Sequence, residues 1–275
     1  MRVLIAVDDS AQSEAVLELG AQFLRASQFG ETPTILTVIS DKQDRPRAQR
    51  TLAYGRDLLD DVAEHLRAKI RTGHVASEII KETQEERYDL LVVGLKPETS
   101  LLAWWRGSTT TQLIEQVDCS VALAKGSIRP LRRILLCDSG GKSPSLVNHF
   151  ISSLGSLLSQ EISITVLHVM SQISAGPHAK TADLVAGADE LIRAGTPEGQ
   201  WLAQDLKLLE NAQVRGIPKV RHGLVVDEIL SEAINGDYDL VAIGAHQREG
   251  WTGFLFDNLA RQITTQIDRP VLLVR

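Results

Sequence analysis

The stretch Tyr88-Asp89-Leu90-Leu91-Val92-Val93-Gly94 returns 150 residues later as Tyr238-Asp239-Leu240-Val241-Ala242-Ile243-Gly244. Around it, residues 69–125 align without a gap onto residues 219–275, and sixteen of the 57 positions are identical. Solenoid repeats have periods of roughly 20–50 residues, so a repeat this long indicates one domain present twice. The sequence therefore predicts two domains, 1–127 and 131–275, each long enough to bury a core of its own.

The composition is that of an ordinary globular chain, with 43% hydrophobic and 23% charged residues and a net charge of −6. This spread-out acidic excess gives no electrostatic support for nucleic-acid binding. No apolar run approaches the roughly 18 residues of a membrane span, and the first apolar run is too short for a signal peptide. Cys119, Cys137 and the seven histidines lack disulfide-framework or metal-ligand spacing. We expect a cytoplasmic protein with no metal site.

Short apolar runs alternate with segments of helical periodicity. Continuous apolar runs are typical of strands covered on both faces. The predicted strands are 3–7, 34–39, 69–71, 90–93 and 121–123, and then 133–136, 163–170, 219–221, 240–243 and 271–274. The predicted helices are 13–29, 47–66, 75–86 and 108–117, and then 145–158, a segment ending near 214, 226–234 and 258–267. Residues 171–199 are expected to form a surface loop around a short helix at 183–193.

This element order predicts the α/β class. Because parallel crossovers are right-handed, each copy should form a doubly wound, five-stranded parallel sheet with strand order 3-2-1-4-5. The fifth strand of each copy is then an aliphatic edge, and an unprotected edge tends to be paired. We predict that residues 121–123 pair with residues 271–274, so that one chain forms an intramolecular pseudo-dimer. The sequence leaves a homodimer open.

Chemistry is expected where the strand order reverses, at the carboxyl ends of strands 1 and 4. Asp8 follows strand 1, Gly94 follows strand 4, and Gly107-Ser108-Thr109 begins a helix. A carboxylate can accept hydrogen bonds from a ribose or a base, and a helix N-terminus favours phosphate. The alternatives are local: Asp8 as a turn residue, Gly94 and Gly244 as turn glycines, and Ser108 as a helix N-cap.

In these residues the chain resembles a tandem universal stress protein. That family carries Val-Asp-x-Ser after strand 1, matched by Val7-Asp8-Asp9-Ser10, and G-x2-G-x9-G-[ST] after strand 4, whose spacing is kept from Gly94 to Ser108. The resemblance implies an adenine nucleotide alpha hydrolase-like fold, with ATP or AMP bound in some members, and Mg only where ATP is bound. The nucleotide-binding residues it implies are Asp8, Val38, Gly94, Gly107, Ser108 and Thr109, with Asp138 and Gly244 in the second copy.

Two departures bear on nucleotide binding. Pro97 stands at the second glycine of the motif and lacks a backbone N–H. One lost hydrogen bond to a charged group costs about 1.5–3 kcal/mol, or about one to two decades in affinity. In the second copy Asp257 and Asn258 replace Gly107 and Ser108, which places a carboxylate where a phosphate would lie. We therefore expect nucleotide chiefly in the first domain.

Three functions stay open at this stage. The first is a non-catalytic stress-response protein that binds an adenine nucleotide. The second is a scaffold with degenerate sites, acting through protein contacts or an apolar small molecule on loops that carry Trp104, Trp105 and Trp251. The third is a weak nucleotide hydrolase. The segment Ser139–Ser143 lacks the first glycine of a phosphate-binding loop, so we interpret it as a glycine-rich turn.

Overall fold

The computed structural model describes residues 1–27, 31–95, 109–138, 144–158, 161–170, 186–244 and 262–275. Two compact units are present. The first comprises Met1–Pro130 with Arg269–Leu273 and Arg275, and the second comprises Leu131–Asp268 with Val274.

The first unit contains a parallel sheet of five strands from its own repeat. These are β1 (Val3–Ala6), β2 (Thr34–Ile39), β3 (Arg67–Thr72), β4 (Leu90–Gly94) and β5 (Ser120–Ala124). The order is β3-β2-β1-β4-β5, and every pairing among them is parallel. The predicted order is confirmed. The strand order reverses between β1 and β4, whose carboxyl ends therefore border a crevice.

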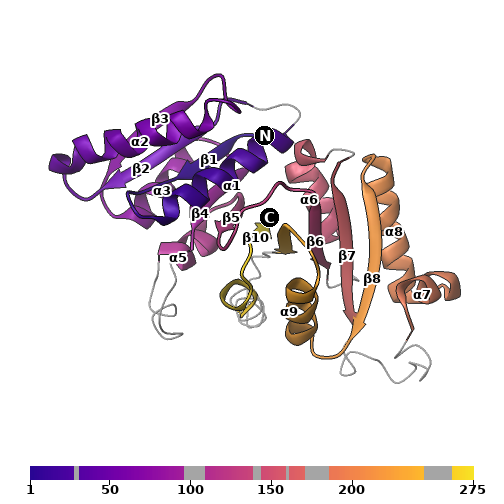
Figure 1. Ribbon diagram of the computed structural model, residues 1–275. Helices are drawn as coiled ribbons and strands as arrows, with labels where there is room; N and C mark the ends of the chain where they lie inside the picture. The colour runs from indigo at the N-terminus through magenta and orange to yellow at the C-terminus, as the bar shows by residue number, and fades with distance from the viewer. Residues whose placement is uncertain (28–30, 96–108, 139–143, 159–160, 171–185, 245–261) are drawn as a thin grey trace. The chain divides into compact units, whose positions relative to one another are not determined.

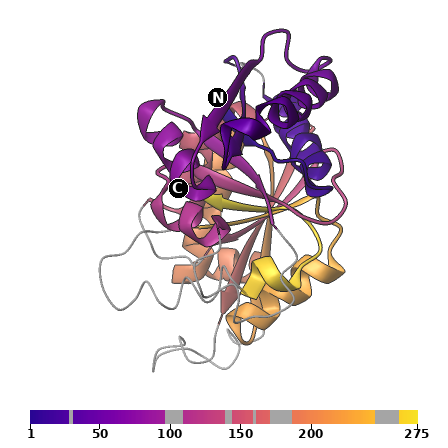
Figure 2. The same ribbon diagram turned by 90° about the vertical axis from the view of Figure 1, so that its left-hand side faces the viewer.

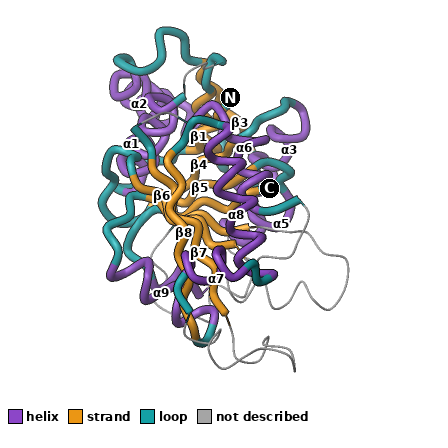
Figure 3. The backbone as a smooth tube through the Cα atoms, turned by 90° about the vertical axis from the view of Figure 1, so that its right-hand side faces the viewer, coloured by secondary structure: helices purple, strands orange, loops and turns teal. Residues whose placement is uncertain are grey.

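Helices cover both faces of this sheet. They are α1 (Gln12–Ala26), α2 (Arg45–Leu59) after the short 3-10 helix η1 (Lys42–Asp44), α3 (Val75–Glu85) and α5 (Thr109–Gln116). Figure 3 shows α1 and α2 on one side of the strands and α3 and α5 on the other. Figures 1 and 2 show the same unit from two other directions. The predicted helix 47–66 is too long, because the chain turns at Leu59, whose carbonyl accepts from the N–H groups of Val62 and Ala63.

The β5 edge of the first unit is paired. The strand β10 (Val271–Val274) lies antiparallel to β5, with Val271 opposite Leu123 and Leu272 opposite Ala122. The predicted pairing of the two fifth strands is confirmed. Leu272, Ala122 and Leu123 are fully buried, so this edge is covered by aliphatic contacts and backbone hydrogen bonds.

The second unit repeats the plan. Its strands are β6 (Arg133–Asp138), β7 (Ser163–Met170), β8 (Arg215–His222) and β9 (Leu240–Gly244). They are parallel in the order β8-β7-β6-β9. Its described helices include α6 (Leu146–Leu154) with the 3-10 turn η2 (Gly155–Leu157), α7 (Ala188–Ala194), α8 (Pro197–Asn211) and α9 (Val225–Asn235), and residues 262–266 are also helical. Figure 3 shows α6 and α8 on the face opposite α9.

The expectation for 171–199 is partly confirmed and partly wrong. Residues 171–185 lie outside the described residues, the expected short helix is present as α7 (Ala188–Ala194), and the loop does not reach 199 because Pro197 already begins α8. The Thr196 hydroxyl caps α8 by accepting from the Gly199 N–H at 3.1 Å. A threonine N-cap followed by proline in the first turn is a regular helix start, and the surrounding glycine and proline residues obscured it.

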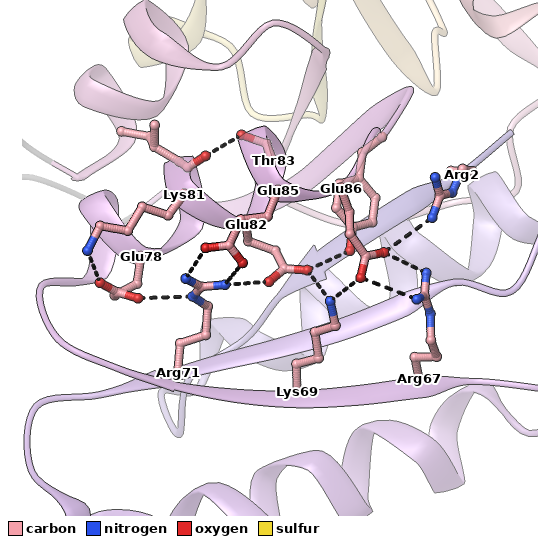
Figure 4. Close-up of polar contacts among 12 residues, drawn as sticks. Arg2, Arg67, Lys69, Arg71, Glu78, Lys81, Glu82, Thr83, Glu85 and Glu86 are labelled. Atoms are coloured by element: carbon pink, nitrogen blue, oxygen red, sulfur yellow. Dashed lines mark hydrogen bonds and ion pairs between the residues drawn. The ribbon is translucent and has the colours of Figure 1, made fainter.

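Ion pairs join α3 to the edge strand β3. Figure 4 shows Arg67, Lys69 and Arg71 on one face of β3, opposite the glutamates of α3. At the centre, Glu82 is 1% exposed and accepts from Lys69 at 2.5 Å and from Arg71 at 2.9 Å. The Tyr88 hydroxyl donates to the same carboxylate at 2.8 Å. Charged side chains on an edge strand disfavour pairing with another chain, so this cluster holds α3 and protects the edge.

The second unit repeats the centre of this cluster. Glu232 is 1% exposed and accepts from Lys219 at 2.8 Å, from Arg221 at 2.7 Å and from the Tyr238 hydroxyl at 2.6 Å. Burial alone would raise the pKa of Glu232, but the Lys219, Tyr238 and Arg221 hydrogen bonds outweigh it and lower the pKa. The carboxylate is therefore held ionised in a partly dry site.

Candidate functional site

A cavity of about 390 Å³ opens at the carboxyl ends of β1, β2 and β4 in the first unit. Its lining includes Asp8, Val38, Gly94 and Thr109, four of the six residues predicted for this domain. The other two, Gly107 and Ser108, lie outside the described residues, as does Pro97. The strands and α5 thus bring four separate sequence segments to one mouth, as the doubly wound topology requires.

Asp8 is held by the first turn of α1. Its Oδ1 accepts from the Ser10 N–H at 3.0 Å, from the Ser10 hydroxyl at 2.5 Å, and lies 3.0 Å from the Ser13 hydroxyl. The Ser13 oxygen also accepts from the Asp8 N–H at 3.0 Å. Asp8 therefore stabilises its own turn and also lines the cavity. These contacts fix the orientation of the carboxylate before any ligand arrives.

Gly94 permits close approach of α1 to β4. A Cβ at this position would lie 3.2 Å from Val16 Cγ2 and 3.6 Å from Gln12 Oε1. Gly94 is not among the glycines with positive φ, so close packing, and not a left-handed turn, explains the residue. Gln12 crosses the same gap and donates to the Leu95 carbonyl at 2.7 Å. The cavity floor is thereby fixed to α1.

The walls of this cavity combine apolar and polar side chains. Val38 from β2 and Val75 and Ile79 from α3 supply aliphatic surface, and Thr109 and Thr110 supply hydroxyls from the start of α5. Among the described residues of the lining, Asp8 is the one charged side chain. One carboxylate with aliphatic walls suits a flat, hydrogen-bonding ligand such as a nucleoside.

The described residues at the equivalent end of the second unit carry different side chains. Asp138 ends β6, in register with His168 on β7, where the first unit has Asp8 and Val38. His168 is 8% exposed and lies edge-on to Trp201, with ring centroids 6.2 Å apart. Asp205, on α8, is 3% exposed and accepts from the Ser145 hydroxyl at 2.6 Å. Gly244 ends β9 and is buried.

Sequence reasoning missed Ser13, Gln12, His168 and Asp205 as residues of these mouths. Ser13 carried a local signal, because it lies five residues after Asp8 at a helix start. Asp205 lies 60 residues from Ser145 in the chain, and no spacing rule connects the two. His168 was interpreted as an ordinary strand position, and its place in β7 confirms that.

Two absences apply within the described ranges. No described helix combines the length and apolar character needed to cross a bilayer. The described histidine, cysteine and acidic side chains form no group of three or more placed to hold a metal ion. Asp257, Asn258, Trp104, Trp105 and Trp251 lie outside these ranges.

Comparison with known proteins agrees with this architecture. A model of the universal stress protein family matches residues 1–125 and again residues 131–275. The chain therefore belongs to the universal stress protein family, in its tandem form.

Individual relatives are distant. A universal stress protein of Synechocystis sp. is 25% identical over 121 residues, which are 44% of this chain and 41% of that protein's length. A solved universal stress protein from Archaeoglobus fulgidus DSM 4304 has a TM-score of 0.71 at 14% identity, covering 100% of this chain and 96% of that one. A protein of unknown function from Pseudomonas aeruginosa PAO1 has a TM-score of 0.65 at 17% identity, covering 99% and 92%. At these identities the structures show a shared fold.

Proposed function

We propose that this chain is a non-catalytic, cytoplasmic stress-response protein whose first domain binds an adenine nucleotide in the cavity beside Asp8. The observation that carries the proposal is the meeting of Asp8, Val38, Gly94 and Thr109 around one cavity of about 390 Å³. These residues come from four chain segments; the family's nucleotide motif includes Asp8 and Gly94 and ends at Ser108, directly before Thr109.

The chemistry assigns parts of the nucleotide to parts of the cavity. The Asp8 carboxylate, oriented by Ser10 and Ser13, would accept hydrogen bonds from ribose hydroxyls or a base amino group. The aliphatic side chains of Val38, Val75 and Ile79 would contact the base. The phosphates would lie at the start of α5, near Thr109 and the preceding Gly107-Ser108, where a helix N-terminus favours negative charge. ATP would carry Mg with it, and AMP would not.

A non-catalytic role has support in the same lining. Hydrolysis of a phosphoanhydride or phosphate ester bond of a nucleotide is promoted by a positioned base or a metal-bound nucleophile. Among the described residues of the cavity, Asp8 is the one ionisable side chain, and it lies at the end assigned to the sugar and base.

The second domain supports a different role. In the second unit His168 stands in register with Asp138 and lies edge-on to Trp201, where the first unit has the aliphatic Val38. We propose that this domain binds no nucleotide and acts as a scaffold, through protein contacts or an apolar small molecule. The pairing of β5 with β10 then stands in for the contact between two chains of a family dimer.

The test is calorimetric titration of the full-length protein with AMP, and with ATP in the presence and absence of Mg. We expect one nucleotide per chain. Asp8→Asn keeps the shape but removes the charge, and should weaken binding about 10–100-fold, because a hydrogen bond to a charged group contributes about 1.5–3 kcal/mol.

Asp9→Asn is the matched control. Asp9 is the neighbouring carboxylate, pairs with Arg47, and is not part of the 390 Å³ cavity lining, so its variant should bind as the wild type does. Wild-type protein that binds neither nucleotide would overturn the proposal. Equal losses in the two variants would remove the assignment to Asp8.

A further inference from the structure

Arg275, the residue that follows β10, contacts the last turn of α5. It belongs to the first compact unit, as do residues Arg269–Leu273. Its guanidinium donates through Nη2 to the Ile114 carbonyl and through Nη1 to the Val117 carbonyl. Its backbone N–H donates to the Ser120 hydroxyl on β5 at 3.1 Å. A residue of the second repeat is therefore fixed beside β5, with its side chain bonded to the end of a helix from the first repeat.

The last turn of α5 needs a partner of this kind. The last four carbonyl groups of an α-helix have no partner inside the helix. A cationic side chain there donates to these carbonyls and interacts favourably with the helix dipole. The eight residues of α5 include no basic residue in the last turn, and a helix of about two turns has little stability of its own. Arg275 supplies, from another segment, the cation that the sequence of α5 lacks.

The hydrogen bonds of Arg275 satisfy both sides of the contact. The side chain is half-buried, and burial lowers the pKa of Arg275. An arginine nevertheless stays charged in proteins, and a charge taken out of water must be met by hydrogen-bond partners. The carbonyl groups of Ile114 and Val117 are such partners. Removal of the guanidinium would therefore leave polar groups at the end of α5 without this donor.

The opposite end of α5 belongs to the cavity beside Asp8. Thr109, Thr110 and Leu113 all line that cavity, whereas Arg275 does not. A helix of eight residues is only about 12 Å long. Fraying or displacement of its last turn, at Arg275, would therefore reach its first turn, at the cavity.

We propose that Arg275 is a positioning residue for the nucleotide site of the first domain. By capping the last turn of α5, it holds Thr109 and the backbone N–H groups of the first turn where the phosphates bind. The inference rests on the nucleotide site proposed above and adds a residue that the cavity lining does not contain. It gives the second repeat a part in ligand binding by the first.

The test is calorimetric titration of full-length variants with AMP, and with adenosine in competition against AMP. Arg275→Met removes the guanidinium and keeps an unbranched side chain. We expect its AMP affinity to fall about three- to tenfold, the size of a charge interaction at a helix terminus. Its adenosine affinity should not change, because adenosine has no phosphate to place at α5.

Two further variants separate positioning from a general loss of structure. Arg275→Lys restores the charge and should recover part of the AMP affinity; the equivalent residue of the first repeat is itself a lysine, Lys125. Arg275→Gln keeps an amide donor without the charge, and takes the place of Arg275→Met if that variant does not fold. Without ligand, hydrogen–deuterium exchange should be faster in α5 of the neutral variants and unchanged in α1.

Arg56→Met is the matched control, because Arg56 is an exposed arginine in the last turn of α2 in the same unit; it should bind AMP as the wild type does. If the wild type binds AMP and the neutral Arg275 variants bind it equally well, the role of Arg275 is overturned and the proposed function stands. Equal losses for AMP and adenosine would also overturn that role, because they would reflect a general loss of structure. A wild type that binds no nucleotide would overturn the proposed function itself, and this inference with it.

Discussion

At the residue scale, the two units share a buried glutamate at the centre of a charged cluster. Glu82 and Glu232 are each 1% exposed, and each accepts from a lysine, an arginine and a tyrosine. A buried charge is stable only when its partners satisfy it. The tyrosine hydroxyl is the neutral donor of the set, so it can be removed without a change in net charge at neutral pH.

We predict that Tyr88→Phe and Tyr238→Phe destabilise the protein by similar amounts. Each substitution removes one hydrogen bond to a buried carboxylate and leaves the ring in place, so the expected loss is about 1.5–3 kcal/mol in the free energy of unfolding. Urea unfolding of the two variants and the wild type measures it. Tyr54→Phe is the control, because Tyr54 is 49% exposed. A loss below 0.5 kcal/mol in both variants, about the size of an exposed substitution, would show that the tyrosines do not support the glutamates.

The same clusters explain an error of sequence reasoning. The strands β3 and β8 were predicted as 69–71 and 219–221, yet they span Arg67–Thr72 and Arg215–His222. An apolar run marks a strand covered on both faces, whereas these edge strands place charged residues towards the glutamates of α3 and α9. The sequences of β3 and β8 are polar because their lysine and arginine side chains pair with glutamates. Those glutamates lie on α3 and α9, so the sequence of the strand alone does not reveal them.

At the element scale, α7 and α8 cross at a glycine. A Cβ on Gly199 would lie 2.1 Å from the Leu191 carbonyl oxygen and 2.7 Å from the Ile192 nitrogen. Both atoms are backbone, so no rotamer change can relieve the contact. The crossing of the two helices therefore depends on the absence of a side chain at this position.

We predict that Gly199→Ala destabilises the second unit, because α7 or α8 must move to accept the methyl group. Overpacking of this kind costs about 1–3 kcal/mol, and hydrogen exchange in α7 should rise more than in α3 of the first unit. Gly155→Ala is the matched control, since a Cβ there meets nothing within 4 Å. Equal stability of the two variants would contradict the crossing as described.

At the scale of the whole molecule, β10 from the second repeat covers the β5 edge of the first repeat's sheet. The side chains of Ala122 and Leu272 are directly opposite each other in the antiparallel β5–β10 pair. Directly opposite residues of such a pair have Cβ atoms about 4.5–5.5 Å apart, within reach of a disulfide after small adjustments. The register is therefore open to a covalent test.

We predict that Ala122→Cys combined with Leu272→Cys forms a disulfide on mild oxidation, detected as a change in mobility without reductant and by mass spectrometry of the linked peptides. Ala122→Cys with Leu273→Cys is the control, because successive side chains of a strand point to opposite faces. The wild type, with Cys119 and Cys137, reports any background. Linkage in the control pair instead of the opposed pair would place the register one residue away.

The sequence by itself determined the duplication, the doubly wound order and the pairing of the fifth strands. These follow from local apolar periodicity and from chain-topology rules. Both depend on the sequence of each segment by itself and on the order of the segments along the chain. It also pointed to Asp8 and Gly94, because a motif preserves their spacing, and the family resemblance added Val38 and Thr109. Only the tertiary structure brought Asp205 to Ser145, and placed His168 edge-on to Trp201. These contacts join segments far apart in the chain, and whether a carboxyl group is buried, and so keeps its proton, depends on what packs around it.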